Sequence, residues 1–542
     1  MVESCNVMWQ KIWLKMQTTV FGGAVIVGSS WVVSKVLGLL RQRLIASTFG
    51  NEGADPIYAA FAVPDFIYGT LILGSLLTAF MPVFIAYRQK DEAEAWRISR
   101  TIIALLFWLF LGLGAVLLLA AGPIVNALVG NKLEPEAVRT TVSLTRIMSV
   151  TMLFFAVSNV FSGILQSFKH FFAISLAPIV NNLGIIFGVF ILVPMMGTLG
   201  VAWGAVLGAM LHASVTLVAA WRLGWRPGAG AGWKHPGVRQ IGNLLLPRTV
   251  GQSVTQINQL VNIPIATRLG PGNLSMFRWA NDIQDVPISI IGVTMATVSF
   301  PIFVELLSQN KKEEFIKHFS AIVRQILFLI IPITVLFIQL RAQFVRLIIG
   351  AGEISWPVTI VTAQTVAYFA VSFFAQALIP VLARSFYAMQ DTKTPVRITV
   401  VAVGLDVVGS LILGPMMGVE GLALSFTISS IISAAWLMIA LHRRVGHLDE
   451  ERIFSSVLKI LGVTMMMGLT VQGTKYFLDS FGLVLTSGFA VLVQAVVAGG
   501  VGIFAYIVFS ILFRIEEASM LSRGWEMLRA LVRPGNGKGA SA

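Results

Sequence analysis

Charged side chains that stand inside long apolar runs are the residues of this sequence best suited to bind a ligand. Arg278 and Asp282 are four residues apart, and Asp285 shares their face if the stretch is helical. The three either form an internal ion pair or present charge to a substrate, and the spacing leaves both readings open. Other basic residues in or beside apolar runs are Lys35, Arg41, Arg43, Arg146 and Arg248.

A charge at the middle of a bilayer costs about 2.5–3.5 kcal/mol on insertion scales. Each such residue therefore needs a water-filled cavity or a partner, although Arg43 and Arg248 are close enough to span ends to extend to the interface. The acidic groups at depth are fewer, namely Asp65, Asp282, Asp285 and Asp406. The excess of cations favours a cavity for an anionic substrate.

Two groups of candidates depend on local geometry. Lys35 and Arg41 do not share a stripe on an ideal helix, so a single site that contains both requires a bend at Gly38. Asp406 either faces a cavity, where it is a candidate ligand for a monovalent coupling cation, or bonds to a nearby hydroxyl. The sequence does not choose between these two roles.

The elements that carry these charges are membrane spans. Of 542 residues, 56% are hydrophobic and only 12% are charged, far fewer charges than a soluble protein of this length carries. Apolar runs of about 20 residues recur, the length that crosses a hydrocarbon core. We predict an all-α polytopic membrane protein with fourteen transmembrane helices, near residues 18–48, 56–87, 99–125, 140–166, 171–193, 196–220, 241–268, 274–306, 318–340, 356–384, 396–414, 420–441, 455–476 and 484–512.

The distribution of Lys and Arg predicts the orientation of these spans. Basic and nearly neutral loops alternate, with 25 Lys or Arg on one side of the membrane and 6 on the other. The positive-inside rule makes the basic side, which holds both termini, cytoplasmic. The net charge of +14 therefore lies mainly in cytoplasmic loops, and we expect no nucleic-acid partner.

The sequence lacks the common motifs of enzymes. It has no Walker A motif, no HExxH and no nucleophile elbow. Its single cysteine, Cys5, excludes an internal disulfide and a thiolate metal cluster. We therefore expect no catalytic residue, metal or cofactor, and we interpret the glycine-rich segment 226–233 as a flexible cytoplasmic loop.

Three short motifs occur twice at a nearly constant offset. "IASTFG" returns as "IATRLG" after 220 residues, "PMMGTLGVA" returns as "PMMGVEGLA" after 221, and "VPDF…FMPVF" returns as "VPIS…SFPIF". Each copy holds six spans, so both halves insert with the same orientation, as two parallel lobes with substrate bound between them. The predicted parts are an N-terminal lobe (1–225), a C-terminal lobe (240–445), two further helices (455–513) and a cytoplasmic tail (514–542).

The segment "FYAMQDTKTPVRI" (386–398) closely resembles a signature of the MurJ (MviN) family of lipid II flippases, in the multidrug/oligosaccharidyl-lipid/polysaccharide exporter superfamily. Supporting matches are "SKVLGLLRQRLIASTFG", "AP…NN" at 177–182 and "LP…GQSVTQIN". The resemblance implies two six-helix lobes around a cationic cavity, alternating access, and a groove for a polyprenyl tail on the last two helices. Lys35, Arg41 and Arg146 match basic positions of the family pattern.

The chain departs from the family pattern at two places. After the proline of the second span, where the family usually has two arginines and a glutamate, the chain reads "VPDFIYGTLILGS" without a cation. In the eighth span, Asp282 stands where the family usually has an arginine, whereas Asp285 retains the acid. These departures leave the identity of the lipid-linked glycan open.

The resemblance implies a flippase of the bacterial inner membrane that moves a polyprenyl-diphosphate-linked peptidoglycan precursor to the outer leaflet. Lys35 and Arg41 would contact the diphosphate, with support from Arg146, Arg248 and Arg278. Membrane lipids are the other expected partners, and the energy source is left open between a monovalent cation and the membrane potential. The alternatives are a lipid-linked polysaccharide flippase and a non-transporting membrane scaffold. A cation-coupled drug exporter would need an acidic cavity, contrary to the charge count.

Overall fold

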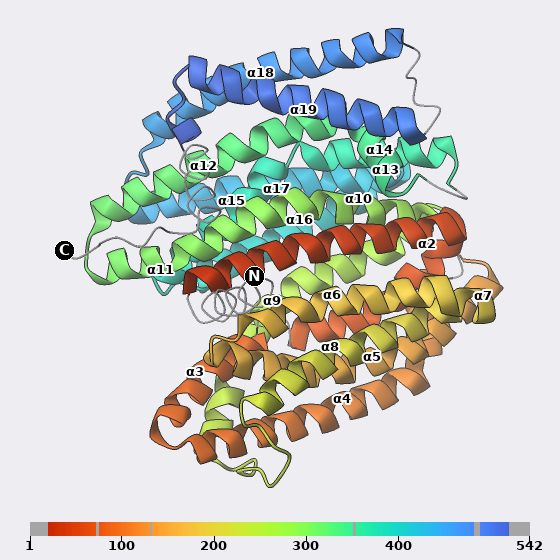
Figure 1. Ribbon diagram of the computed structural model, residues 1–542, viewed down its shortest axis with the longest axis vertical. Helices are drawn as coiled ribbons and strands as arrows, with labels where there is room; N and C mark the ends of the chain where they lie inside the picture. The colour runs from red at the N-terminus through yellow and green to blue at the C-terminus, as the bar shows by residue number, and fades with distance from the viewer. Residues whose placement is uncertain (1–19, 72–74, 131–132, 351–353, 482–487, 520–542) are drawn as a thin grey trace, which may run out of the picture. The chain divides into compact units, whose positions relative to one another are not determined.

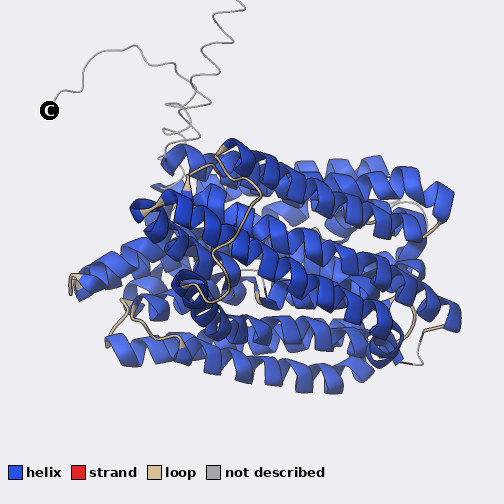
Figure 2. Cartoon of the chain, turned by 90° about the horizontal axis from the view of Figure 1, so that it is seen from below, coloured by secondary structure: helices blue, strands red, loops and turns tan. Residues whose placement is uncertain are grey.

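The computed structural model describes residues 20–71, 75–130, 133–350, 354–481 and 488–519. These residues form helices joined by loops, and no strand occurs among them (Figure 2). The longer helices, labelled in Figure 1, are α2 (Val20–Leu71), α3 (Ser75–Lys90), α4 (Glu92–Val129), α5 (Pro135–Ser167), α6 (Phe171–Phe187), α8 (Leu199–Arg222), α9 (Pro236–Arg268), α10 (Asn273–Ile288), α11 (Thr294–Ser308), α12 (Lys312–Gln339), α14 (Trp356–Ala370), α15 (Phe373–Ala388), α16 (Lys393–Met417), α17 (Val419–Val445), α18 (Glu450–Ser480) and α19 (Gly488–Leu512). The shorter ones are η2 (Gly188–Leu192), α7 (Val193–Met196), η3 (Ser289–Val293), α13 (Arg341–Ile348) and η4 (Glu516–Ala518).

The all-helical membrane architecture is confirmed. Ten helices of the described residues are long and apolar enough to cross a membrane, and the pair α14 and α15, bent by 45°, raises the number to eleven. Eleven of the fourteen expected spans fall on these helices. The other three fall on α2, on the end of α2 with α3, and on α9, so the count of fourteen stays a prediction.

The chain forms two compact units. The first holds residues up to Asp282 together with Ile348–Thr362 and Thr399–Ser425, and the second holds Ile283–Leu347, Ala363–Ile398 and the residues from Phe426 onward. In the first unit α4, α5, α6 and α8 pack side by side (Figure 1). In the second unit α12, α18 and α19 pack together. The predicted boundaries of the two lobes stay a prediction.

The first long helix breaks at Gly50, not at Gly38. Within α2 the one residue with non-helical backbone angles is Gly50, with φ 66° and ψ −170°. Gly50 ends the motif "IASTFG", and Gly270, with φ 124°, ends its repeat "IATRLG". Because positive φ is readily adopted by glycine, both copies of the motif end a helical segment at the same point. The expected bend at Gly38 is wrong, and Lys35 and Arg41 stay on one continuous helix.

The duplicated "PMMG" motifs form the same turn in both copies. Gly197 and Gly418 have φ of 60° and 69°, and each donates its N–H to a carbonyl four residues earlier at 2.8 Å and 2.7 Å. Three residues on, Gly200 and Gly421 donate back to these glycines at 3.0 Å and 3.1 Å. Shared local geometry at an offset of 221 residues supports the duplication inferred from the sequence.

Close approach of α6 and α8 depends on glycines in both helices. A Cβ atom added at Gly184 would lie 2.3 Å from the Cα of Gly208, and one added at Gly188 would lie 2.6 Å from the Cα of Gly204. Small residues at such crossings let backbones approach and pack without an intervening side chain. The pair α6 and α8 thus forms a tight backbone support for the residues that α6 contributes to the site.

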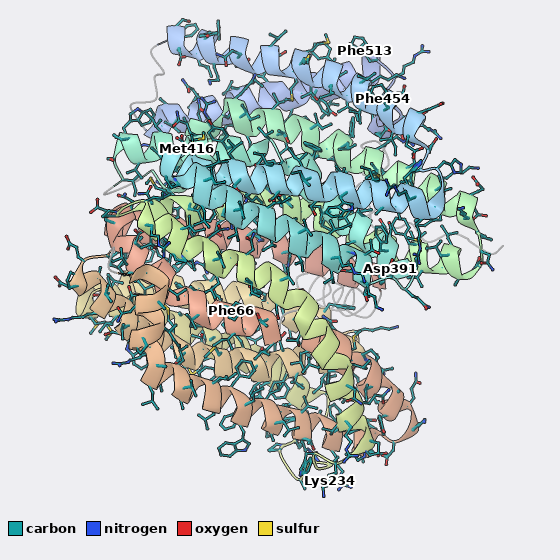
Figure 3. All side chains as sticks on the ribbon, turned by 180° about the vertical axis from the view of Figure 1, so that it is seen from behind. Phe66, Lys234, Asp391, Met416, Phe454 and Phe513 are labelled. Atoms are coloured by element: carbon teal, nitrogen blue, oxygen red, sulfur yellow. The ribbon has the colours of Figure 1, made fainter. Side chains whose placement is uncertain are left out.

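The glycine-rich loop between α8 and α9 is tied to α4. Ala231 donates its N–H to the Thr101 hydroxyl at 2.8 Å and to the Arg97 carbonyl at 3.1 Å. From α4, Arg100 donates to the Arg226 carbonyl at 2.7 Å. The segment 226–233 is a loop as predicted, but these bonds hold it against the start of α4. Lys234 follows it at the edge of this unit (Figure 3).

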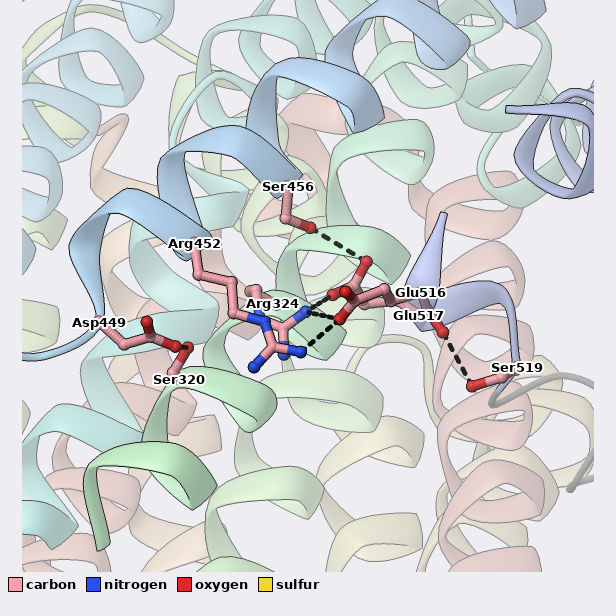
Figure 4. Close-up of polar contacts among 8 residues, drawn as sticks. All are labelled: Ser320, Arg324, Asp449, Arg452, Ser456, Glu516, Glu517 and Ser519. Carbon is pink, nitrogen blue, oxygen red and sulfur yellow. Dashed lines mark hydrogen bonds and ion pairs between the residues drawn. The ribbon is translucent and has the colours of Figure 1, made fainter. Parts of the chain in front are cut away.

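A buried ion-pair cluster fastens the end of α19 to two other helices. Arg324 of α12 pairs with Glu517 and, at 3.1 Å, with Glu516, both in η4 just after α19 (Figure 4). Ser456 of α18 donates to Glu517 at 3.0 Å, and Arg452 pairs with Glu516 at 2.7 Å. Arg324 and Glu517 are only 8% and 4% exposed, whereas Arg452 and Glu516 are mostly exposed.

This difference in burial makes a prediction about stability. Glu517→Gln leaves the buried Arg324 without its closest charge partner and should lower the free energy of unfolding by about 3–5 kcal/mol. Arg452→Gln, the control at the exposed end of the cluster, should cost about 1 kcal/mol or less. Thermal unfolding in detergent measures both. Equal effects of the two changes would contradict the prediction, as would failure of Arg324→Leu combined with Glu517→Leu to recover stability.

Candidate functional site

The predicted ion pair between Arg278 and Asp282 is present, and it includes a second acid. Arg278 Nε lies 4.0 Å from Asp282 Oδ1, and its Nη2 lies 3.8 Å from Asp65 Oδ2 on α2. Arg278 and Asp282 are partly exposed, and Asp65 is 53% exposed. The group joins one positive charge to two negative ones, so Arg278 is internally neutralised rather than an isolated cation.

A chain of neutral donors holds Asp282 in place. Trp279 Nε1 donates to the Tyr58 hydroxyl at 2.8 Å, Tyr58 donates to Gln42 Oε1 at 2.5 Å, and Gln42 Nε2 donates to Asp282. The rings of Tyr58 and Trp279 also meet edge to face, with centroids 6.4 Å apart. All three donors are buried. The search for charged residues missed them because they are uncharged, although Gln42 adjoins Arg41.

These side chains line a small cavity between α2, α9 and α10. Tyr58, Asp65 and Arg278 meet Gln256 and Gln259 there, and Phe66, which is visible on α2, forms part of the wall (Figure 3). The cavity has a volume of about 20 Å³. This is room for about one water molecule, so a diphosphate would enter this part of the site only after the helices separate.

The two span 1 cations have different neighbours. Arg41 Nη1 donates to Asn182 Oδ1 on α6 at 3.2 Å, and Asn182 donates in turn to the carbonyl and hydroxyl of Ser34. Arg41 also lies near enough to Asp65 to interact with it electrostatically. The ammonium of Lys35 stands 5.4 Å from the centre of the Trp31 ring. Asn182 belongs to the "AP…NN" motif, which therefore positions Arg41.

The remaining site candidates lie elsewhere or have other contacts. Arg146 is exposed, and its Nε donates to the Leu118 carbonyl of α4 at 3.1 Å. Asp285 accepts a hydrogen bond from Ser289 at 2.9 Å. Arg248 lies in α9, but its side chain is outside the described part of the structure. The described contacts thus gather Arg41, Asp65, Arg278 and Asp282 and do not bring Arg146 to them.

Asp406 is fully buried on α16 in a separate polar cluster. Asn262 Nδ2 lies 3.4 Å from its carboxylate, Ser410 bonds to it at 3.5 Å, and Asn258 is also a hydrogen-bond partner. The Oδ1 atoms of Asn258 and Asn262 are buried and have no hydrogen-bond partner among the described residues. A carboxylate beside two unsatisfied amide oxygens is a set of ligands that suits a hard cation. Both roles predicted for Asp406, hydroxyl bonding and cation binding, fit this geometry.

Asp55, in the expected loop between the first two spans, anchors the start of α10. Its carboxylate accepts from the N–H of Gly272 at 2.7 Å, and from the N–H and hydroxyl of Ser275 at 2.8 Å and 2.6 Å. Burial raises the pKa of Asp55 to about 6, although these three bonds oppose the shift. The group is therefore largely ionised at neutral pH, where it complements the positive end of the α10 dipole. This contact fixes the segment that carries Arg278.

Comparison with known proteins identifies the family. A family model described as lipid II flippase MurJ matches residues 45–493. The chain belongs to this family. The lipid II flippase MurJ of Burkholderia cenocepacia is 25% identical over 433 residues, covering 78% of this chain and 84% of the relative. The resemblance seen in the signature segment is thus confirmed over most of the chain.

Solved structures share the fold. A lipid II flippase MurJ in an inward closed conformation is 22% identical, has a TM-score of 0.75, and covers 90% of this chain and 99% of its own. An inward-facing multidrug resistance transporter of the MATE family, in the MOP superfamily, is 15% identical with a TM-score of 0.68 and covers 79% of this chain and 99% of its own. Both likenesses concern the fold, and the name of the family describes transport rather than catalysis.

The Asp282 network separates two roles for the span 8 face. Asp282→Asn keeps an acceptor for Gln42 but removes one of the two acids that neutralise Arg278. If this face meets an anionic headgroup, the variant should bind a polyprenyl diphosphate several-fold more tightly, a gain of about 1 kcal/mol for a partly exposed pair. Titration of the purified protein measures this, with the exposed acid change Glu136→Gln as control.

The opposite result would assign the pair a structural role. In that case Asp282→Asn lowers the melting temperature and leaves lipid affinity unchanged. Arg278→Leu combined with Asp282→Leu would then restore the melting temperature, because neither charge is left without a partner.

Proposed function

We propose that the protein flips lipid II, or a closely related polyprenyl-diphosphate-linked peptidoglycan precursor, across the bacterial inner membrane by alternating access. The observation that carries the proposal is the family match, which spans 449 residues from position 45 to 493 and includes both halves of the repeat. Cell-wall growth and cell shape would depend on this step. Both termini lie in the cytoplasm under this proposal, in agreement with the distribution of basic loops.

The headgroup diphosphate would bind first at α2. Lys35 and Arg41 are half-buried cations whose described partners are an aromatic ring, an amide oxygen and the more distant Asp65. A diphosphate can replace the amide of Asn182 at Arg41 at little electrostatic loss, because the amide carries no net charge. Arg278, by contrast, must leave Asp65 or Asp282 to contact the substrate. We assign Arg278 a supporting role that follows opening of the cavity.

Rescue of growth tests the function. The chain should complement a bacterium depleted of its own lipid II flippase, and Lys35→Ala and Arg41→Ala should each reduce lipid II transport by at least about tenfold, or about 1.4 kcal/mol. Arg139→Ala, which changes an exposed cation at the start of α5, is the control and should rescue fully. Protein level and melting temperature should be unchanged in all three.

Failure of the unmutated chain to rescue, with normal expression, would contradict the flippase proposal and favour the scaffold. Rescue of a lipid-linked polysaccharide exporter but not of lipid II transport would favour the polysaccharide alternative. That alternative draws on Asp282, which replaces the family's usual arginine.

A monovalent cation bound at Asp406 is the second part of the proposal. Rotation of the Asn258 and Asn262 amides would turn their unsatisfied oxygens toward the carboxylate, and the Ser410 hydroxyl adds a further oxygen. The cation would neutralise a buried acid whose ionised form is otherwise costly in the membrane. Its release to one side would then be coupled to the change in conformation.

Sodium should stabilise the protein through this cluster. At ten times the dissociation constant, bound Na⁺ adds about 1.4 kcal/mol to the free energy of unfolding, so the melting temperature should be higher in NaCl than in choline chloride at equal ionic strength. Asp406→Asn should abolish the difference, whereas Glu420→Gln, an acid change on α17, should keep it. An identical melting temperature in the two salts for the unmutated protein would contradict cation binding.

A further inference from the structure

A second basic pocket lies in the second unit, where α15, α16 and α17 meet. Its volume is about 250 Å³. It shares no residue with the cavity around Arg278 or with the Asp406 cluster. The lining residues are Phe386, Asp391, Thr394, Trp436, Ile439, Ala440, Arg443 and Arg444.

The signature segment builds one wall of this pocket. Asp391 caps the start of α16, because its carboxylate accepts from the N–H of Lys393 at 3.1 Å and from the N–H and hydroxyl of Thr394 at 3.0 Å and 2.8 Å. Its own N–H donates to the Phe386 carbonyl at 2.9 Å. These bonds fix the turn between α15 and α16 at the end of the helices, where Asp391 lies (Figure 3).

Two arginines from the last turn of α17 supply positive charge. Arg444 Nη1 lies 3.9 Å from Asp391 Oδ2, a distance too long for a hydrogen bond. Arg443 has no ion pair among the described residues. The Asp391 carboxylate is already engaged by the first turn of α16, so the pocket keeps a net charge of +1 and unused guanidinium donors. A phosphodiester carries one negative charge and accepts such donors in pairs.

The wall nearer the middle of α17 is apolar and exposed. Trp436 is 45% exposed and Ile439 is 52% exposed. Ile432 and Ile428 continue the same stripe, at 39% and 45% exposure. On a membrane span an exposed apolar stripe faces lipid chains, and tryptophan is enriched at the headgroup level. The pocket therefore joins a cationic end to a lipid-facing surface.

We propose that this pocket binds the phosphodiester headgroup of an anionic phospholipid from the cytoplasmic leaflet. Arg443 and Arg444 contact the phosphate, the Thr394 side chain lies beside the glycerol, and Trp436 and Ile439 pack against the upper part of one acyl chain. Basic pockets between transmembrane helices on the cytoplasmic side have this property in general. A soluble phosphate would use the arginines but gain nothing from the apolar wall, so the geometry favours the lipid.

A lipid titration of the full-length protein tests the proposal. The melting temperature is followed in detergent as phosphatidylglycerol, phosphatidylcholine or inorganic phosphate is added. Phosphatidylglycerol should stabilise the protein, whereas phosphatidylcholine and inorganic phosphate should not. Arg443→Gln should weaken the apparent affinity for phosphatidylglycerol by about tenfold, because a charge-assisted contact is lost. Arg397→Gln, an exposed cation on α16 outside the pocket, is the matched control and should leave the affinity unchanged.

A second readout locates the lipid. Phosphatidylglycerol with brominated acyl chains should quench part of the tryptophan fluorescence, and Trp436→Phe should remove that part. Arg443→Lys keeps the charge but loses the paired donors, so its affinity should fall between those of the unmutated protein and Arg443→Gln. The proposal is overturned if inorganic phosphate stabilises as well as the lipid does, or if Arg443→Gln and Arg397→Gln have equal effects. Quenching that Trp436→Phe leaves unchanged would also overturn it.

Discussion

The lack of water in the hydrocarbon core governs the arrangement of polar groups in this protein. A charge or a hydrogen-bonding group at that depth must find its partner within the chain or in a hydrated cavity. Arg278 has Asp65 and Asp282, Arg41 has Asn182, and Asp406 has Asn262. Substrate binding is therefore an exchange of partners, and its strength is a difference between the new contacts and those given up.

This exchange distinguishes the cations of the site. Arg41 gives up a neutral amide, whereas Arg278 gives up a carboxylate, so the two are unequal as contacts for a diphosphate. The replacement of the family's usual arginine by Asp282 strengthens the contrast, because it adds an acid one turn from Arg278. Positive potential is thus concentrated along α2, and the headgroup would bind there in preference to α10.

Burial decides what the charged clusters of the second unit can do. Arg324 and Glu517 exclude water and satisfy each other, which fastens α12 and α18 to the chain end after α19. Arg443 and Arg444 are exposed, and the acid beside them is engaged by a helix start. The first cluster therefore serves stability, and the second leaves donors for a ligand.

The sequence alone determined the class of protein. Apolar runs of membrane length, alternating basic loops, the duplicated motifs and the signature segment 386–398 are local patterns, and they predicted helices, repeat and family. The i,i+4 pair of Arg278 and Asp282 was predictable for the same reason. Only the tertiary structure decided which distant residues join them: Asp65, Gln42 and Tyr58 come from α2, and their contacts depend on how helices pack rather than on spacing along the chain. It also placed the break of α2 at Gly50 instead of Gly38, because a helix bends where packing and a positive φ require it, not at every glycine.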